Sequence, residues 1–313
     1  ASRHLGGLGA DVIKVESPAG DAIRHAPPLR ADGLSHIFAL CNTDKRGVVL
    51  DLKDPKQLEI LHGLLSQADV LIENMRQGAL AKLGVSAEVL RTRYPDLIYC
   101  SLNGFGNDSA YPGRAALDTV IQATSGLMSL TQVNGSPVKA GISASDMIAG
   151  EFGLLAVLAG LEHRDGTGRA IHFDLSMQDT SVWMTQIAWP GSSPGEPVVL
   201  REALDGFVVA IATEDDVNRV VGSQSFAESR AAFCARLSGA GIDCAPVLTT
   251  SEAMTSDHVV ARQLLVQRTT ADGDVWPVLQ SPMRISGRPI DIRTVMPRLG
   301  NSGPISFHEV ECK

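Results

Sequence analysis

Short apolar runs alternate with longer stretches of helical periodicity over the first 180 residues of the chain. Runs rich in β-branched residues predict four strands, at 11–16, 47–52, 68–73 and 97–102. Between them, apolar residues return every three or four positions over 55–67 and 86–94, which predicts helices, the second with Ser86 as its N-cap. Because helices of this length join parallel strands through right-handed crossovers, the pattern predicts an α/β fold with a mainly parallel sheet.

The longest helical signal runs from Ser145 to about His163, and a further strand-like run follows at 171–176. This helix is apolar on nearly every side, so we expect it to be buried. A stretch rich in Pro, Gly and Ser then predicts a linker, and the apolar run at 206–212 opens a smaller second unit. We expect a large domain at 1–185, a linker at 186–203, a small domain at 204–280, and a C-terminal segment at 281–313 that returns towards the large domain.

The size and composition are those of an ordinary globular protein. The chain has 313 residues, 44% hydrophobic and 20% charged, which is enough for two domains because single cores stop growing near ~250–300 residues. No stretch reaches ~18–20 uninterrupted apolar residues, so we expect no membrane span. The first residues lack the apolar core of a signal peptide, and the five widely spaced cysteines indicate free thiols. The expected location is the cytoplasm.

Charge and motif spacing exclude several classes of function. The formal net charge is −8 without a long basic run, which argues against nucleic-acid binding, since that needs clustered Lys and Arg. A few local cations would still suffice for a polyanionic ligand. The histidines and cysteines show no metal-ligand spacing, so we expect no metal. The glycines at 6, 7 and 9 precede a strand, unlike a dinucleotide fingerprint, and no Gly-x-Ser-x-Gly motif of a hydrolase occurs.

Two aspartates stand at the start of otherwise apolar helical stretches. Asp146 opens the long helical segment, and Asp118 precedes another apolar helix. A carboxylate is favoured there by the exposed N–H groups and the helix dipole. Such a residue is more often a cap than a catalytic group, so the pattern alone leaves both interpretations open.

Six segments in order add a family resemblance. They read LGADVIKVE from residue 8, NTDKRGVVLDLK from 42, ADVLIEN from 68 with GAL from 78, DTVIQATSGLM from 118, DMIAG from 146, and RDGTG from 164 with aspartates at 174 and 179. These segments resemble the class III CoA-transferase family, a superfamily that includes formyl-CoA transferase, carnitine CoA-transferase and α-methylacyl-CoA racemase. The resemblance implies a doubly wound, mainly parallel, Rossmann-like large domain with a smaller α+β domain.

The resemblance also implies a reaction and a site. The expected activity is acyl-CoA:carboxylate CoA transfer, in which an aspartate attacks the thioester and later carries CoA as an aspartyl-CoA thioester. In this chain that aspartate is Asp146. Coenzyme A would enter as the acyl-CoA substrate, a carboxylic acid would be the acceptor, and the family implies an interlocked homodimer. The positions that correspond to CoA contacts in the family are Leu50, Lys53, Asn74, Met75, Arg76, Lys82 and Asp118, the last beside the reacting end.

Two alternatives remain at this point. The first is an acyl-CoA racemase or epimerase of the same superfamily, which needs a His before the aspartate at position 118. Here that residue is Leu117, which cannot exchange a proton with an α-carbon. The second is a catalytically silent CoA-binding relative or scaffold. It is suggested by the short segment from Met184 to Leu204, which lacks the glycine-rich loop that covers the intermediate in formyl-CoA transferase.

Overall fold

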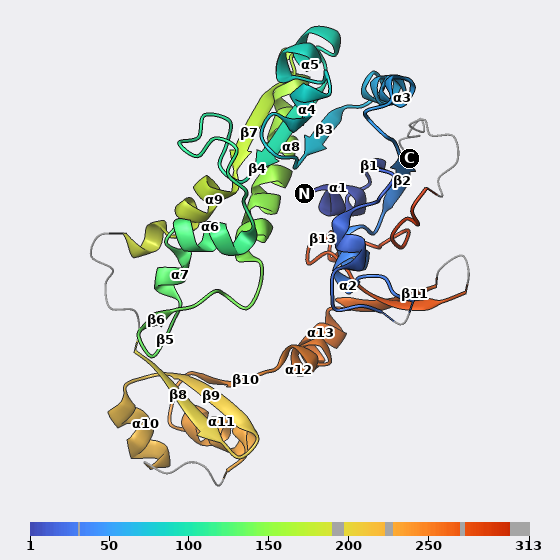
Figure 1. The fold of residues 1–313 in the computed structure, drawn as a ribbon. Helices are drawn as coiled ribbons and strands as arrows, with labels where there is room; N and C mark the ends of the chain where they lie inside the picture. The colour runs from blue at the N-terminus through green and yellow to red at the C-terminus, as the bar shows by residue number, and fades with distance from the viewer. Residues whose placement is uncertain (31, 190–196, 223–227, 270–272, 301–313) are drawn as a thin grey trace. The chain divides into compact units, whose positions relative to one another are not determined.

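The computed structural model describes residues 1–30, 32–189, 197–222, 228–269 and 273–300 (Figure 1). The chain forms two compact units. The large unit consists of Ala1–Ile187 together with the described part of Val266–Lys313, and the small unit consists of Ala188–Leu265. The candidate residues named above all lie in the large unit.

The strands of the large unit that precede the small unit include two parallel sheets. Strand β1 (Val12–Glu16) pairs with β2 (Lys45–Val49), and β4 (Ile98–Asn103) lies between β3 (Val70–Glu73) and β7 (His172–Ser176). The predicted strands are therefore present, although β2 begins and ends earlier than the expected 47–52. A mixed α/β fold with parallel sheets is confirmed.

Local signals explain where the connecting helices begin. The side chain of Asp54 accepts a hydrogen bond from Lys56 N ahead of the helix at 55–65, and Ser86 caps the helix at 87–93 by accepting from Val89 N. These two helices are the ones predicted from periodicity. The helices of this half of the unit are α1 (Ser2–Gly7), α2 (His36–Cys41), α3 (Pro55–Leu65), α4 (Ala79–Lys82), α5 (Ala87–Arg93), α6 (Asp118–Thr124), α7 (Leu127–Leu130), α8 (Ala144–Thr167) and α9 (Met177–Met184).

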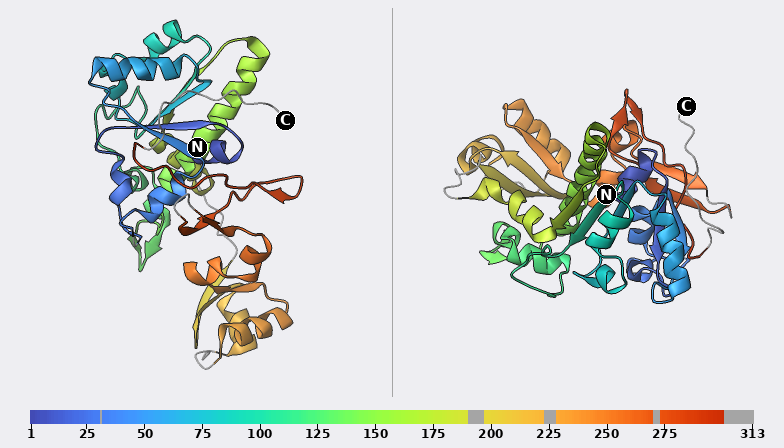
Figure 2. Two further views of the ribbon diagram at one scale, coloured as in Figure 1. Left: turned by 90° about the vertical axis from the view of Figure 1, so that its right-hand side faces the viewer. Right: turned by 90° about the horizontal axis from the view of Figure 1, so that it is seen from above.

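Helices cover both faces of the sheet β3-β4-β7. Successive side chains of a strand point to opposite sides, so neighbouring residues of β4 report on the two faces. On one face, Tyr99 packs in a core with residues of α3 and α5, including Leu61 and Leu90. On the other face, the next residue of the same strand, Cys100, packs against Leu154 and other residues of α8. Figure 2 shows α8 and the pair α3 and α5 on opposite sides of these strands.

Helix α8 approaches the sheet closely along a stripe of small residues. Ala149, Gly153 and Gly160 are buried on this side, and a Cβ placed on Gly160 would lie 2.9 Å from Ile98 Cγ2. By length and composition alone α8 could also cross a membrane, but a core helix passes the same test. The small residues on this side allow the close packing of α8 on the sheet.

The expectation that α8 is buried on all sides is wrong for one side. Met147 is 60% exposed and Leu155 is 61% exposed in the single chain. A helix that lies on one face of a sheet contacts it along only one stripe, and apolar composition does not reveal which residues face away. The apolar pattern therefore overestimated the burial of this helix.

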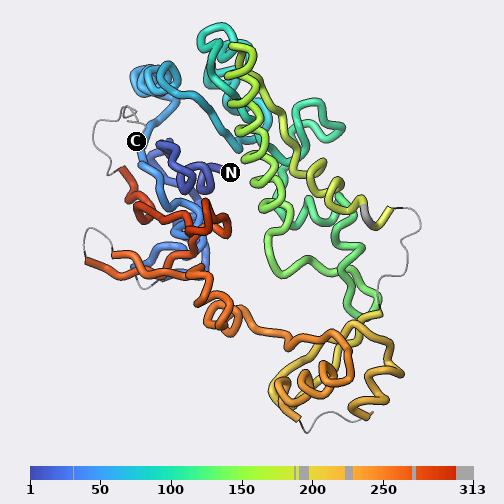
Figure 3. Tube along the Cα trace, turned by 180° about the vertical axis from the view of Figure 1, so that it is seen from behind, coloured from blue at the N-terminus to red at the C-terminus, as the bar shows by residue number. Residues whose placement is uncertain are grey.

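The segment that follows the small unit packs back on the first strands of the large unit. Trp276 of β12 (Val275–Leu279) and Met296 share a core with Phe38 of α2. Figure 3 shows this red trace beside the blue N-terminal segment. The chain rejoins the large unit at Val266, before residue 281 where the return was expected, because β12 supplies side chains to this core.

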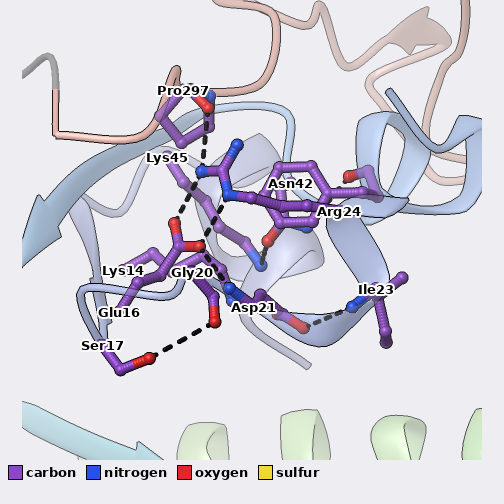
Figure 4. Close-up of polar contacts among 11 residues, drawn as sticks. Lys14, Glu16, Ser17, Gly20, Asp21, Ile23, Arg24, Asn42, Lys45 and Pro297 are labelled. Atoms are coloured by element: carbon purple, nitrogen blue, oxygen red, sulfur yellow. Dashed lines mark hydrogen bonds and ion pairs between the residues drawn. The ribbon is translucent and has the colours of Figure 1, made fainter. Parts of the chain in front are cut away.

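A buried ion pair strengthens this return (Figure 4). The Arg24 guanidinium donates two hydrogen bonds of 2.7 Å to the Glu16 carboxylate at the end of β1, and Nη2 also reaches Pro297 O at 3.2 Å. The ring of Phe38 lies 4.1 Å from the guanidinium. Because both charges are buried and fully paired, loss of either partner would leave an uncompensated charge.

The small unit is built on an antiparallel sheet. Strand β9 (Gly206–Ile211) lies between β8 (Val198–Ala203) and β10 (Cys244–Val247), and α10 (Glu214–Val221) and α11 (Arg230–Gly239) complete its core. Strand β8 occupies the last third of the segment 186–203 predicted as a linker, and Val199 of this strand is buried. Residues 190–196 of that segment lie outside the described residues.

Candidate functional site

Asp146 is the third residue of α8, and its side chain is exposed. Among the described residues its carboxylate accepts no hydrogen bond. The residue that precedes the helix, Ser143, makes no side-chain cap either. A carboxylate in the first turn of a helix usually binds the free N–H groups. Because the Asp146 carboxylate does not, capping does not explain why an aspartate stands at this position.

The capping is instead done by Asp118, the first residue of α6. Its Oδ1 accepts hydrogen bonds from the backbone N–H of Ser145 at 3.0 Å and of Asp146 at 3.4 Å. The side chain of Asp118 is only 8% exposed. The structure thus brings the two aspartates predicted from sequence together, and it gives them different tasks.

The second carboxylate oxygen of Asp118 is bound as well. Gln122 Nε2 donates to Oδ2 at 2.7 Å, and the ammonium of Lys139 lies 3.2 Å from the same oxygen. Gln122 is fully buried and also binds the segment before α8, through Ile142 O and Ala140 N. The sequence analysis included Gln122 only as part of a motif, and it missed Lys139. The spacing of four residues between Asp118 and Gln122 on one helix could have indicated the contact of Gln122 with Asp118.

The pKa of the Asp146 carboxyl is raised above its usual value. Partial desolvation is the main cause and the negative charge of Asp118 the second, while the ammonium of Lys139 acts in the opposite direction. A more basic carboxylate is a better nucleophile once ionised, and such shifted groups gather at functional sites. The structure thus places an exposed carboxylate of raised pKa in the first turn of the long helix α8.

Asn74, Met75 and Arg76 follow the carboxyl end of β3, and all three are exposed. Asn74 Nδ2 donates to Leu102 O at 2.7 Å. Leu102 in turn packs in a small core with residues of α6 and α8, including Ala149. This chain of contacts connects the end of β3 with the helix that carries Asp146, at the edge of a parallel sheet where ligands commonly bind.

Leu50, Lys53 and Lys82 are placed differently. Leu50 and Lys53 follow the carboxyl end of β2, and Lys82 ends the short helix α4. The side chain of Leu50 is 4% exposed and belongs to the core, so only its backbone could face a ligand. Both lysines are exposed. Within the described part of the chain, no hydrogen bond or ion pair joins these three to Asp146, and their contact with CoA stays a prediction.

Glu73, which sequence reasoning quoted but gave no role, orders the segment after β3. Its Oε2 accepts the backbone N–H of Met75 at 2.7 Å, and its Oε1 accepts from Ser101 at 2.6 Å and Tyr99 at 3.1 Å. Burial and the nearby Glu73 charge raise the pKa of Tyr99 to about 12, so its hydroxyl remains a donor. Three donors on one carboxylate fix the backbone at Met75.

Two further features do not extend the site. A pocket of about 520 Å³ between the ends of α3 and α5 is lined by His62, Arg93 and Tyr94 among others, and it contains none of the candidate residues. No group of three or more His, Cys, Asp or Glu suited to a metal ion occurs in the described ranges.

Comparison with known proteins places this arrangement in a family context. The model of CoA-transferase family III matches residues 1–202 and 209–302. The succinate–glutarate CoA-transferase of Agrobacterium fabrum is 29% identical, over 99% of this chain and 91% of that protein. The succinyl-CoA:mesaconate CoA-transferase of Haloarcula hispanica is 30% identical, over 96% of this chain and 88% of that protein.

A solved structure agrees with the fold. The crystal structure of a CAIB/BAIF family protein from Brucella suis superimposes with a TM-score of 0.84 at 27% identity, over 96% of this chain and 92% of that one. The alignment with the Agrobacterium protein runs over 368 positions, more than the 313 residues of this chain, so some of its residues have no counterpart here.

Proposed function

The chain belongs to CoA-transferase family III, and on this premise we propose that it transfers CoA between carboxylic acids through a covalent intermediate on Asp146. The observation that carries the proposal is the pair of aspartates. Asp118 supplies the hydrogen bonds that cap α8, which leaves the Asp146 carboxylate exposed and without a partner among the described residues. The proposed route divides one difficult exchange into easier substitutions.

The proposed reaction consists of four substitutions at carbonyl carbons. A carboxylate oxygen of Asp146 attacks the thioester carbonyl of the donor, CoA leaves as the thiolate, and a mixed anhydride forms. The thiolate then attacks the Asp146 carbonyl, which releases the donor acid and leaves an aspartyl-CoA thioester. The acceptor carboxylate attacks this thioester and again displaces the thiolate. Finally the thiolate attacks the acceptor carbonyl, so that acceptor-CoA departs and the Asp146 carboxylate is restored.

We propose short dicarboxylic acids as the substrate class. The two relatives named above act, by name, on succinate or succinyl-CoA together with glutarate or mesaconate, all of which are short dicarboxylic acids or the CoA thioester of one. Three exposed cations, namely Lys53 after β2, Arg76 after β3 and Lys82 at the end of α4, would bind the phosphates of CoA. Asn74, Met75 and the backbone of Leu50 would complete the CoA contacts, with Asp118 beside the reacting end.

The wider setting belongs to the same proposal. We propose a doubly wound, Rossmann-like large domain with a smaller α+β domain, assembled as an interlocked homodimer in the cytoplasm. The helices on both faces of β3-β4-β7 support the first point. The family resemblance supports the dimer, and the free cysteines of the described residues (Cys41, Cys100, Cys234 and Cys244) are typical of a reducing compartment.

The direct test follows CoA exchange and the intermediate together. Succinyl-CoA and glutarate are incubated with the protein, glutaryl-CoA is measured by chromatography, and the peptide that contains residue 146 is examined by mass spectrometry. We expect product, together with a CoA adduct on that peptide that hydroxylamine removes. Asp146→Asn should give neither, whereas transfer by this variant, with the amide verified, would remove Asp146 from the mechanism. Bound CoA without turnover of any of several acyl-CoA donors would favour the silent relative.

A further inference from the structure

We propose that Lys139 is a positioning residue of the transfer reaction, whose ammonium holds Asp118 and the segment leading into α8, and through them the helical turn that displays Asp146. The inference rests on the proposed role of Asp146. It concerns a residue that lies outside all six motif segments. Lys139 is connected to the site only by the tertiary structure.

The ammonium of Lys139 contacts three oxygen atoms. It lies 3.2 Å from Asp118 Oδ2, and it donates hydrogen bonds of 3.1 Å to Ala140 O and to Ile142 O. Of the three ammonium hydrogens, two are donated to these backbone carbonyls, and the charge is paired with the Asp118 carboxylate. The geometry therefore points to a role in positioning.

The bonds connect two elements that must keep a fixed distance. Asp118 belongs to α6, whereas Ala140 and Ile142 belong to the segment that enters α8. Gln122 repeats the same connection, because it binds Asp118 Oδ2 and Ile142 O through one amide nitrogen. With both side chains in place, the capping carboxylate of Asp118 cannot move away from Ser145 N and Asp146 N.

Charge gives Lys139 a second effect at this point. The charged groups that act on Asp146 are Asp118 of α6 and Lys139 from the segment before α8. Two carboxylates repel each other, and a single ammonium beside them offsets part of that repulsion. Gln122 also joins Asp118 to the segment before α8, but it carries no charge. A comparison of changes at Lys139 and at Gln122 can therefore distinguish the effect of this connection from the effect of the charge.

The test compares three variants with the wild type under saturating donor and acceptor. Lys139→Met keeps most of the side-chain volume and removes the charge, Lys139→Arg restores the charge, and Arg169→Met removes an exposed cation just beyond the far end of α8. With 24 residues in α8, that cation lies about 36 Å along the helix from the site. We expect kcat of Lys139→Met to fall on the order of tenfold to hundredfold, because small displacements of a reacting group are costly.

The pH profile provides the readout that a purely structural role would not change. Without the ammonium, the pKa of Asp146 rises further, so more of the carboxyl is protonated at a given acidic pH. The acid limb of the kcat profile should move to higher pH in Lys139→Met, return towards the wild-type position in Lys139→Arg, and stay in place in Arg169→Met. The KM for acyl-CoA should change little in all three.

The outcomes separate this inference from the proposed function. If Asp146→Asn is inactive but Lys139→Met keeps both the wild-type kcat and the wild-type acid limb, the positioning role is overturned and the function stands. If Asp146→Asn remains active, the proposed function itself fails. Should Lys139→Met fail to fold, Gln122→Glu and Lys139→Arg provide the same comparison. The inference is supported if Lys139→Arg leaves the acid limb at the wild-type pH while the added carboxylate of Gln122→Glu moves it to higher pH. It is overturned if Gln122→Glu leaves the acid limb unmoved.

Discussion

The carboxylate of Asp118 binds the backbone N–H of Asp146 at 3.4 Å, so that one aspartate caps the helix that displays the other. Two carboxylates are usually kept apart unless cations or hydrogen bonds compensate their repulsion. Here Lys139 and Gln122 both contact the Asp118 carboxylate, whereas the Asp146 carboxylate accepts no hydrogen bond among the described residues. The proposed reaction uses this uncommitted carboxylate.

Asp118→Ala should lower the free energy of unfolding, because it removes the cap of α8. A lost cap costs about 0.5–2 kcal/mol, and Lys139 would in addition lose its ion-pair partner. Urea unfolding followed by circular dichroism measures the change. Asp108→Ala, at an exposed position outside the regular elements, is the matched control and should be close to neutral. Equal stabilities of the two variants would show that Asp118 does not hold α8.

Asp146→Asn should not destabilise the protein at neutral pH, and should stabilise it slightly. The pKa of Asp146 is raised in the folded state, so the folded protein binds this proton more tightly than the unfolded chain. The free energy of unfolding therefore falls as the pH rises from the pKa of the unfolded chain, near 3.8, through the raised pKa of the folded protein. Above both pKa values the loss of stability is complete. The stability gained by Asn should be largest at pH 7 and shrink towards pH 4. A gain that grows towards acidic pH would contradict the shift.

Gly160→Ala should destabilise the fold by about 1–3 kcal/mol, because overpacking forces neighbouring atoms apart. The new methyl group would lie 2.9 Å from Ile98 Cγ2 and 3.0 Å from Phe173 Cε2. Gly166→Ala, in the last turn of the same helix, meets no atom within 4 Å and should instead gain about 0.5–1 kcal/mol from helix propensity. In thermal unfolding, we expect a lower midpoint temperature for Gly160→Ala and a higher one for Gly166→Ala than for the wild type.

Lys53→Ala and Lys82→Ala should each weaken CoA binding by about twofold to fivefold, the effect of one exposed ion pair. The loss should diminish as salt rises, because exposed charges are screened. Isothermal titration with CoA at low and high salt measures both effects. Lys56→Ala removes an exposed charge on α3 and serves as the control. If the double variant at 53 and 82 binds CoA like the wild type, these lysines are not phosphate ligands.

The short stretch between η2 (Gln186–Ala188) and β9 leads to a prediction about water. In the described part of this stretch, Val198–Ala203 is committed to strand β8, which leaves few residues for a covering loop. Closed sites exclude water from activated intermediates. We therefore expect hydrolysis of succinyl-CoA without acceptor, at a rate comparable with transfer. A thiol-release assay with and without glutarate measures it, and transfer without free thiol would show that another element closes the site.

The sequence by itself determined the local structure of this protein. Ser86 and Asp54 mark the starts of two helices because a capping side chain binds N–H groups only two or three residues away. The strands could be predicted from apolar runs because such a run, like a cap, involves only neighbouring residues of one segment. The motif around Asp146 also identified the candidate nucleophile, although periodicity alone could not distinguish it from a helix cap.

Only the tertiary structure decided which aspartate is the cap and which is free. Asp118 reaches Ser145 and Asp146 because α6 and α8 pack together, and Lys139 joins them across a turn that no periodic pattern describes. The same holds for the exposed side of α8, which depends on where the sheet lies. Such contacts join residues more than twenty positions apart, and a single sequence carries no local signal for them.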